Sequence, residues 1–404
     1  MAHKRHKTND PKQIGIKKIF RYIHLWLGLA ASLVICVSML GAAVFVWEED
    51  LTDMYYSELV FADTVGLERL PPSRLFTAVK EKYPDRIWTF LEAKSTDGRN
   101  TIIRAYKTAE NPGWLWTSGI EYYDMAYVNP YTGRVAGYID RKNDWISLAR
   151  FLHQNLLLKS SIGREIIAAS ALIMIFQALS GLYLWWPKKR KALKQRLTIR
   201  WKAHFKRLNW DFHSIGGFYT YLFMIFFAAT GLTWSYQWWA SGMFALMGSS
   251  KEEAFQKPAP PEITVCDFDL PMDIAYSNLV SRRPDWKEMY FAIPQPSREN
   301  GIIYTEAYYD DSSTGWQAMD HYTYNPNDGS LHHSLTQDQK LLAEKWRHSN
   351  YALHVGSIYG LPSKIIAFIC ALFFATLPIS GFLIYWNRNS KSRKAKKRKK
   401  VLTA

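Results

Sequence analysis

Four long apolar segments stand out along the chain, and each has the length and composition of a membrane-spanning helix. They cover residues 23–47, 166–186, 212–240 and 365–386, and none of them contains Asp, Glu, Lys or Arg. About 20 apolar residues cross the hydrocarbon of a bilayer as a helix. The pattern therefore predicts an α-helical membrane protein with four transmembrane helices, and it excludes a purely soluble protein.

Two longer polar regions, 48–150 and 241–350, connect the first span to the second and the third span to the fourth. Each region contains an amphipathic segment, 73–83 or 272–283, that we expect to be helical. Short aromatic and β-branched runs follow these segments, at 87–91, 101–106, 121–128, 288–293, 302–308 and 319–324. Such runs predict one helix on a small antiparallel sheet in each region, so that both regions are α+β modules.

The two halves of the chain resemble each other. Turns of the form Asn-Pro-x-x-Gly end both sets of strand-like runs, at 129–133 and 325–329. The same His-x-x-x-Gly spacing opens spans 1 and 3, and a histidine precedes spans 2 and 4. Each half therefore reads as span, module and span in the same membrane orientation, which predicts two parallel repeats related by an axis along the membrane normal.

Positive charge is concentrated beside the spans. Segments 1–22, 187–210 and 387–404 hold 26 of the 51 Lys and Arg residues and one of the 35 acidic residues, so the remainder carries a net charge of −9. Basic residues that flank spans stay in the cytoplasm. We therefore expect both termini and the middle loop inside, in contact with anionic lipid headgroups. No binding fold surrounds these segments, and we expect no nucleic-acid partner despite the isoelectric point of about 9.5.

These features predict the organisation of the whole chain as a multi-pass membrane protein. The predicted order is a basic cytoplasmic N-terminus (1–22), span 1 (23–47), outer module 1 (48–150), a short His-bearing helix with span 2 (151–186), a basic cytoplasmic loop (187–211), span 3 (212–240), outer module 2 (241–350), a second short His-bearing helix with span 4 (351–386) and a basic cytoplasmic tail (387–404).

Four of the eleven histidines bracket the spans, one for each span. His24 and His213 lie at the cytoplasmic ends of spans 1 and 3, and we call them the inner pair. His153 and His354 precede spans 2 and 4, and we call them the outer pair. Ionisable groups in spans indicate function by default. Equivalent histidines of two-fold-related helices would face each other, and two neutral imidazoles in a helix bundle are suitable axial ligands for a haem iron.

Other residues near the histidines fit this interpretation. Gly28 and Gly217 lie one helical turn after the inner histidines, where the absence of a side chain would let a porphyrin edge approach the backbone. Arg21 and Arg150 each lie three residues before a histidine and are candidate partners of haem propionates. The arginine is not repeated, because Trp210 and Tyr351 occupy the equivalent positions.

The outer histidines lie far from the inner ends of their spans. A single helix from His153 to Trp186 would be about 50 Å long at a rise of about 1.5 Å per residue, whereas the hydrocarbon is only about 30 Å thick. We therefore expect both outer histidines on short helices above the spans, with breaks near 160–163 and 360–362.

The chain contains no C-x-x-C-H motif, so a haem here would be bound without thioether bonds. Metal ions without a porphyrin remain an alternative for the histidine pairs, although no Asp or Glu accompanies the inner pair. His332 and His333, just after the second turn, are a further candidate site for a metal or a substrate.

Four motifs in order resemble the PepSY-associated transmembrane proteins over nearly the whole chain. The motifs are Tyr-Ile-His-Leu-Trp-Leu-Gly (22–28), Phe-Leu-His-Gln-Asn-Leu-Leu (151–157), Asp-Phe-His-Ser-Ile-Gly-Gly (211–217) and Leu-His-Val-Gly (353–356) followed by Gly-Leu-Pro (360–362). Within this family the chain looks most like the bacterial inner-membrane ferric-siderophore reductases. The resemblance implies two periplasmic PepSY-like modules and two non-covalent b-type haems, each with two histidine ligands from the inner or the outer pair.

We therefore expect a transmembrane electron conduit that reduces a periplasmic Fe(III)–siderophore and releases Fe(II) for iron acquisition. The electron donor is a flavin, a quinol or a partner reductase. Two alternatives remain open: a haem-free scaffold or sensor whose modules bind a peptide or peptidase, and a permease for a siderophore or metal. The sequence shows no nucleophile, acid–base pair or phosphate loop, and one-electron chemistry needs none.

Overall fold

The structure is a computed structural model that describes residues 15–187, 189–254, 257–295, 299–310 and 315–402, with the backbone alone from residue 390 onward. Most of the predicted basic N-terminus therefore lies outside the described residues. The chain forms two compact units, which are treated separately below. Unit 1 comprises Met1–Cys36, Ala169–Ala229 and Phe373–Ala404, and unit 2 comprises Val37–Ala168 and Thr230–Leu372.

Within the residues that the structure describes, four helical stretches are long and apolar enough to cross a membrane, which supports the prediction of a multi-pass membrane protein. They are Ile16–Phe45 (α1), Ser160–Trp185 (α6), Phe205–Leu232 and Leu361–Asn389, the last being the first part of α14 (Leu361–Leu402). The third stretch is composite. It consists of α8 (Phe205–Asp211), a π-helical turn (Phe212–Gly216) and α9 (Gly217–Leu232).

The third span ends earlier than the apolar run at 212–240. The backbone turns after Leu232, where the amides of Trp234 and Ser235 bond to the carbonyls of Gly231 and Leu232. A separate helix, α10 (Gln237–Leu246), then follows in unit 2. Apolar composition continues through the turn, and for this reason hydropathy alone did not reveal the end of the span.

Unit 1 is helical. It contains the first part of α1, most of α6, the π-helical turn with its flanking helices, and α14 from Phe373 onward. A 3₁₀ turn at Arg190–Ala192 and the short helix α7 (Leu193–Leu197) lie between α6 and α8.

Unit 2 contains one eight-stranded antiparallel sheet. The strands are β1 (Trp88–Lys94), β2 (Thr101–Thr108), β3 (Ile120–Val128), β4 (Val135–Asp140), β5 (Glu288–Ala292), β6 (Ile303–Tyr308), β7 (Met319–Tyr324) and β8 (Leu331–Leu335). Their order is β4-β3-β2-β1-β5-β6-β7-β8, so the two polar regions each supply four consecutive strands and meet at β1 and β5. The order within one half mirrors the order within the other.

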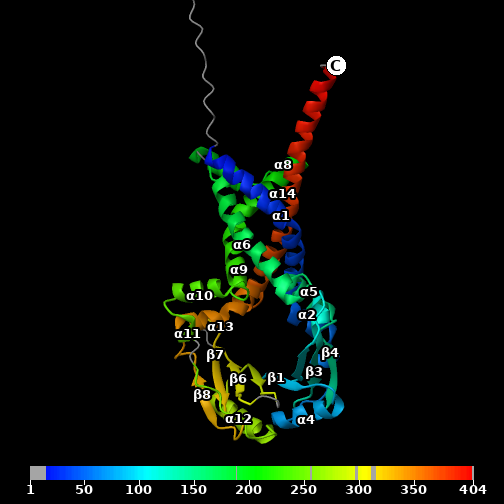
Figure 1. Cartoon of the computed structure of the whole chain (residues 1–404), viewed down its shortest axis with the longest axis vertical. Helices are drawn as coiled ribbons and strands as arrows, with labels where there is room; N and C mark the ends of the chain where they lie inside the picture. Colours follow the sequence, from blue (N-terminus) through cyan, green and yellow to red (C-terminus); the bar gives the residue numbers. More distant parts are fainter. Residues whose placement is uncertain (1–14, 188, 255–256, 296–298, 311–314, 403–404) are drawn as a thin grey trace, which may run out of the picture. The chain divides into compact units, whose positions relative to one another are not determined.

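Two helices cover one face of this sheet. Within unit 2, α4 (Pro72–Lys82) and α12 (Asp269–Arg282) lie along it, as Figure 1 shows. Phe76 of α4 and Leu279 of α12 are fully buried against strand residues such as Phe291. Alternation along each strand points the other side chains to the opposite face, which we call the open face. On β6, for example, Tyr304, Glu306 and Tyr308 belong to the open face.

The sheet differs from the prediction in two ways. The strands β4 and β8, which follow the Asn-Pro-x-x-Gly turns, did not appear among the predicted runs. In addition, the two predicted small sheets join into one through five residue pairs between β1 and β5, from Phe90 and Ala292 to Lys94 and Glu288. A strand edge is stabilised by pairing, and pairing between regions two hundred residues apart leaves no local pattern.

The two turns are alike in detail. Gly133 and Gly329 both have a φ of +73°, and the amide of each glycine bonds to the carbonyl of the turn asparagine, Asn129 or Asn325. Only glycine adopts this backbone conformation without steric cost. The turns therefore fix where β3 and β7 end, in the same way in both halves.

Short helices complete unit 2. They are α2 (Glu48–Tyr55), α3 (Ser57–Val60), α5 (Trp145–Asn155), α11 (Lys251–Ala254) and α13 (Leu342–Val355), with 3₁₀ turns at Trp116–Gly119 and Ser357–Tyr359. Helix α5 is capped by Asp144, whose carboxylate accepts a hydrogen bond from the Ser147 amide, and it is followed by Leu156, which has a φ of +57°. Helix α13 is followed by Gly356, which has a φ of +78°. Both helices are thus separated from the spans that follow them, α6 and α14.

Candidate functional site

The two inner histidines face one another in unit 1. His24 lies on α1, and His213 lies in the π-helical turn before α9. Their ring centres are 6.4 Å apart and their planes are nearly perpendicular, at 89°. π-Helical turns in helices occur frequently at functional sites. Here the turn brings Gly216 against Phe373 so closely that a Cβ at residue 216 would lie 2.4 Å from the Phe373 ring.

A serine hydroxyl determines the tautomer of each inner histidine. Nδ1 of His24 lies 2.8 Å from Oγ of Ser180, and Nδ1 of His213 lies 2.9 Å from Oγ of Ser380. Each hydroxyl already donates its single proton to a backbone carbonyl, that of Phe176 or Leu377. The serines therefore accept from Nδ1–H. Nε2 of both rings is left with a free lone pair, which is the form of imidazole that binds a metal.

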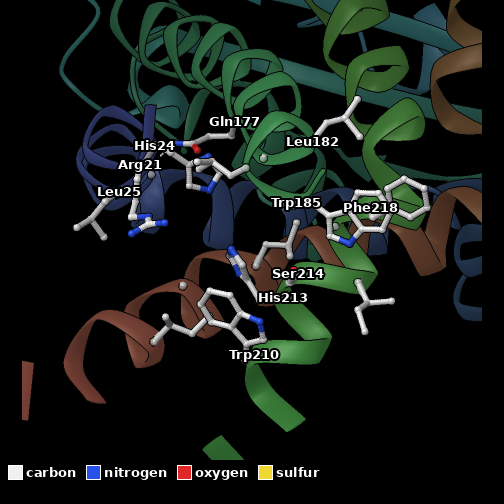
Figure 2. Close-up of a pocket in the computed structure, with 18 of the residues that line it drawn as sticks. Arg21, His24, Leu25, Gln177, Leu182, Trp185, Trp210, His213, Ser214 and Phe218 are labelled. Atoms are coloured by element: carbon white, nitrogen blue, oxygen red, sulfur yellow. Dashed lines mark hydrogen bonds between the residues drawn. The ribbon is translucent and has the colours of Figure 1, made fainter. Parts of the chain in front are cut away.

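A cavity of about 780 Å³ lies beside the inner pair. Its wall includes Arg21, Gln177, Trp185 and Trp210 in addition to the two histidines, and Figure 2 shows both imidazoles directed into the same space. Pockets for small molecules and cofactors measure roughly 300–1,000 Å³ and are mostly apolar with a few polar groups. The inner cavity has this size and character.

Glycines make room for the inner rings. A Cβ at Gly181 or Gly381 would lie 3.4 or 3.2 Å from Cε1 of His24 or His213, so both glycines pack directly on the imidazoles. The predicted Gly28 and Gly217 line the cavity. A Cβ at Gly217 would have no atom within 4 Å, whereas one at Gly28 would lie 3.0 Å from Nε2 of Gln177. Gly217 is therefore the glycine with open space in front of it.

The two outer histidines also face one another, in unit 2. His153 on α5 and His354 on α13 have ring centres 6.0 Å apart and planes at 32°. Aromatic rings pack around them. The ring centre of Phe45 is 6.4 Å from that of His153, and the ring centre of Trp234 is 5.3 Å from that of His354. Burial lowers the pKa of His153, which favours its neutral form.

Hydroxyls hold the outer rings as well. Oγ of Ser38 lies 3.0 Å from Nδ1 of His153 and donates to the carbonyl of the same histidine, so it accepts from Nδ1–H. Oγ1 of Thr230 lies 2.8 Å from Nδ1 of His354. The next residue, Gly231, packs on the imidazole, and a Cβ there would lie 3.1 Å from Cε1 of His354.

The two arginines predicted beside the histidines differ. Arg21 lines the inner cavity, and it has no acidic partner among the described residues. Arg150 pairs with Glu48, with 3.6 Å between Nη1 and Oε2, and Glu48 also pairs with the buried Arg141. Nε of Arg150 is buried without a hydrogen-bond partner. Arg150 therefore has one free donor, but its charge is already balanced.

The spacing of the rings suits a single metal ion between the members of each pair. An imidazole nitrogen binds a metal at about 2 Å and lies about 1 Å from its ring centre, so two rings on opposite sides of one ion have centres about 6 Å apart. Both observed separations agree with this value. Within the described part of the chain, no group of three or more His, Cys, Asp and Glu side chains is arranged to hold a metal. The inner cavity also fits a planar, largely apolar group around the metal.

Sequence reasoning missed the four hydroxyl residues that orient the histidines. They are Ser38, Ser180, Thr230 and Ser380. One signal was available, because a hydroxyl residue followed by glycine occurs in three of the four spans, at 180–181, 230–231 and 380–381. Of the further candidates, His332 is 3.1 Å from the carbonyl of Ala259 through Nε2, and His333 lies on β8 beside β7.

Comparison with known protein families identifies a match over most of the chain. The family model of the PepSY-associated TM region matches residues 21–388, which includes all four histidines of the two pairs. No curated protein matches the chain.

Proposed function

Because the chain belongs to the PepSY-associated transmembrane family, we propose that it is a di-haem b electron conduit of the bacterial inner membrane. In this proposal it acts as a haem-dependent ferric-siderophore reductase on the periplasmic side and releases Fe(II) for uptake. The observation that carries the proposal is the presence of two facing imidazole pairs, each with Nδ1 atoms held by hydroxyls.

The inner pair would hold the first haem. His24 and His213 would supply two nitrogen ligands to its iron, and Ser180 and Ser380 keep the two rings in the metal-binding tautomer and orientation. Arg21 is free to pair with a propionate. A bound haem b supplies an iron that takes up and gives off one electron, at a potential that depends on its ligands and surroundings.

The outer pair would hold the second haem. His153 and His354 would supply the nitrogen ligands, and the apolar rings of Phe45 and Trp234 lie beside them. Burial of this kind shapes a redox potential, because a low dielectric disfavours the more highly charged state of the iron. The unpartnered Nε of Arg150 is the donor available to a propionate here.

The proposal includes the arrangement in the membrane. In it, both termini and the 187–211 loop lie in the cytoplasm, and the sheet of unit 2 lies in the periplasm as two PepSY-like modules. The three basic segments support this orientation. Two parallel repeats are supported by matching triads: His24 with Ser180 and Gly181 in one half, and His213 with Ser380 and Gly381 in the other. The donor on the cytoplasmic side is a flavin, a quinol or a partner reductase.

Reduction of a ferric siderophore needs only one electron per iron. Siderophores bind Fe(III) far more tightly than Fe(II), so an electron delivered on the outer side releases the metal. The family resemblance supports this substrate class, and the net charge of −9 outside the basic segments disfavours strongly anionic chelates.

The test begins with full-length protein expressed with ample haem and purified in detergent. We expect a reduced spectrum with the sharp bands of low-spin b-type haem and two haems per chain. In liposomes with dithionite sealed inside, an external ferric chelate should be reduced and Fe(II) trapped by ferrozine outside. Protein without a Soret band would contradict the proposal and favour a haem-free scaffold. Two haems without reduction of any ferric chelate would leave a haem protein with another electron acceptor.

A further inference from the structure

Four side chains outside the histidine pairs form a continuous row of hydrogen bonds in unit 2. Glu306 and Tyr304 lie on β6, His321 on β7 and His348 on α13. The hydroxyl of Tyr304 is 2.6 Å from Oε1 of Glu306 and 2.7 Å from Nδ1 of His321. Nε2 of His321 is 3.0 Å from Nε2 of His348. The row runs from the open face of the sheet to the helix that carries the outer ligand His354.

The direction of every bond in the row follows from one assumption, that Glu306 is ionised. A carboxylate only accepts, so Tyr304 donates to Glu306 and must accept from Nδ1–H of His321. Nε2 of His321 is then an acceptor, and Nε2–H of His348 donates to it. This leaves Nδ1 of His348 without a proton. That nitrogen is buried and has no hydrogen-bond partner in the described structure.

Electrostatics keep both imidazoles neutral. Burial, followed by the neighbouring His348, lowers the pKa of His321 to about 2, and burial lowers the pKa of His348 to about 3. Lys340, Lys257, His333 and Arg347 act in the same direction, whereas the Glu306 carboxylate, 3.9 Å from Nδ1 of His321, acts in the opposite direction. Each neutral ring has one donor and one acceptor nitrogen. The positive neighbours also disfavour a metal cation between the two Nε2 atoms.

The tautomers that follow from an ionised Glu306 are set for transfer in one direction. When a proton supplied by solvent water binds Nδ1 of His348, the Nε2 proton of His348 passes to Nε2 of His321. His321 then releases its Nδ1 proton to the oxygen of Tyr304, and Tyr304 releases its own proton to Glu306. Each nitrogen or oxygen that loses a proton gains another, so the net change is one proton moved from Nδ1 of His348 to the Glu306 carboxylate.

The Glu306 end of the row is more accessible than its interior. The side chain of Glu306 is 21% exposed on the open face, whereas that of His321, inside the row, is 6% exposed. Across β5 and β6, Glu306 is paired with Tyr290, beside a second Glu–Tyr hydrogen bond between Glu288 and Tyr290. A chelate can therefore reach the Glu306 end of the row. Loss of iron leaves the chelating oxygens in need of protons, and a carboxyl group at this position can supply one.

We propose that Glu306 donates a proton to the chelate as the iron leaves, and that Tyr304, His321 and His348 return a proton to Glu306. This inference rests on the proposed reduction of ferric chelates on the outer side. In balance, the ferric substrate gains the one electron that the proposed reductase supplies, an iron–oxygen bond of the chelate breaks, and an oxygen–hydrogen bond forms with the proton that Glu306 has received through the row. Glu306 thereby returns to the carboxylate form, which the row, here called the relay, protonates again. The proton and the electron are then both supplied through α13.

The decisive comparison is between Tyr304→Phe and Tyr308→Phe. Both tyrosines donate to Glu306, at 2.6 Å to Oε1 and 2.9 Å to Oε2, but Tyr304 also bonds to His321. Full-length holoprotein in detergent is reduced without oxygen and mixed with ferric acetohydroxamate, while haem reoxidation and Fe(II) release are followed. At pH 7 we expect Tyr304→Phe to slow reoxidation by about tenfold or more and Tyr308→Phe by less than about twofold.

A second measurement distinguishes a role of Tyr304 in proton supply from a role in holding Glu306 in place. In Tyr304→Phe, added formate buffer should restore the rate in proportion to its acid form, because a small acid replaces the missing proton donor. His321→Gln keeps hydrogen bonds but cannot pass a proton, and should behave like Tyr304→Phe. Equal slowing by both tyrosine variants, or no response to formate, would overturn the relay. A wild type whose reduced haem is not oxidised by the chelate would instead contradict the proposed function.

Discussion

In both histidine pairs Nδ1 is bonded to a hydroxyl from another helix, whereas the surroundings of the rings differ between the pairs. The inner rings are perpendicular and border an open cavity that contains Arg21. The outer rings are inclined at 32° and lie between Phe45 and Trp234, near an arginine already paired with Glu48. The part common to both sites is the oriented imidazole. The part that differs is the charge and packing around it, which are the features that tune a bound haem.

The strongest test of this comparison removes one ligand from each pair. We expect His213→Ala to abolish the inner haem and His354→Ala to abolish the outer haem, so each variant keeps one haem per chain. Transmembrane reduction should be lost in both. Haem content per chain, measured after denaturation in alkaline pyridine, gives the result.

His332→Ala is the matched control and should retain two haems, because His332 bonds to the Ala259 carbonyl away from both pairs. Electron paramagnetic resonance adds a sharper check. The angle between the two ligand planes alters the splitting of the iron d orbitals, so the two low-spin signals should differ and each variant should lose one. Two identical signals in the wild type would remove the distinction between the sites.

The second largest effect is expected from removing the hydroxyl groups that bond to Nδ1 of the inner histidines. Ser380→Ala frees the His213 ring to rotate and to adopt the other tautomer, and loss of such a partner typically weakens metal binding by about 10–100-fold. Ser180→Ala should do the same through His24. Ser214→Ala is the control, because Ser214 lines the inner cavity without a hydrogen bond to either imidazole among those described. The rate at which haem leaves each variant and is captured by apomyoglobin measures the difference in haem binding. Unchanged dissociation in the serine variants would show that packing alone orients the rings.

These hydroxyls also show where sequence reasoning reaches its limit. The four spans were predictable because charge-free apolar runs of this length are typical of helices that cross a bilayer. The histidines were predictable because they are rare at span ends and recur in both halves. Ser180 and Ser380 were not singled out, because serine in a membrane helix commonly bonds to its own backbone. Only the structure shows that these serines also accept from a histidine on another helix.

The sheet and the relay also depend on contacts that the sequence did not predict, between residues far apart in the chain. The helix and strand patterns of each half were visible, but the pairing of β1 with β5 joins segments with no shared local signal. His321 and His348 are separated by a strand, a turn and a helix start, and their meeting depends on how α13 packs on β7. Interactions between distant elements depend on how those elements pack, and a single sequence has no local pattern that reveals this packing.

The open space in front of Gly217 allows a side chain to be added there without disturbing existing contacts, which tests whether a haem occupies the inner cavity. A Cβ at Gly217 meets no atom within 4 Å, so Gly217→Leu should fold normally while its side chain occupies the inner cavity. We expect the inner haem to bind about tenfold more weakly, with the outer haem unaffected. Gly242→Leu is the control, since Gly242 has the same open space but lies on α10. Full inner-haem occupancy in Gly217→Leu would show that the porphyrin does not reach this helix.

The smallest expected effect concerns the two arginines. Arg21 has no acidic partner among the described residues, so removing its charge in Arg21→Gln should favour the oxidised inner haem. An interaction on the order of 1 kcal/mol corresponds to a fall in potential of about 40 mV for one electron. Arg150→Gln should lower the outer potential by less than half as much, because Glu48 already offsets the Arg150 charge. Glu48→Gln should raise the outer potential, since it leaves that charge unbalanced. Potentiometric titration of the two haem bands measures all three shifts. Equal shifts for the two arginine variants would mean that Glu48 does not distinguish the outer site from the inner one.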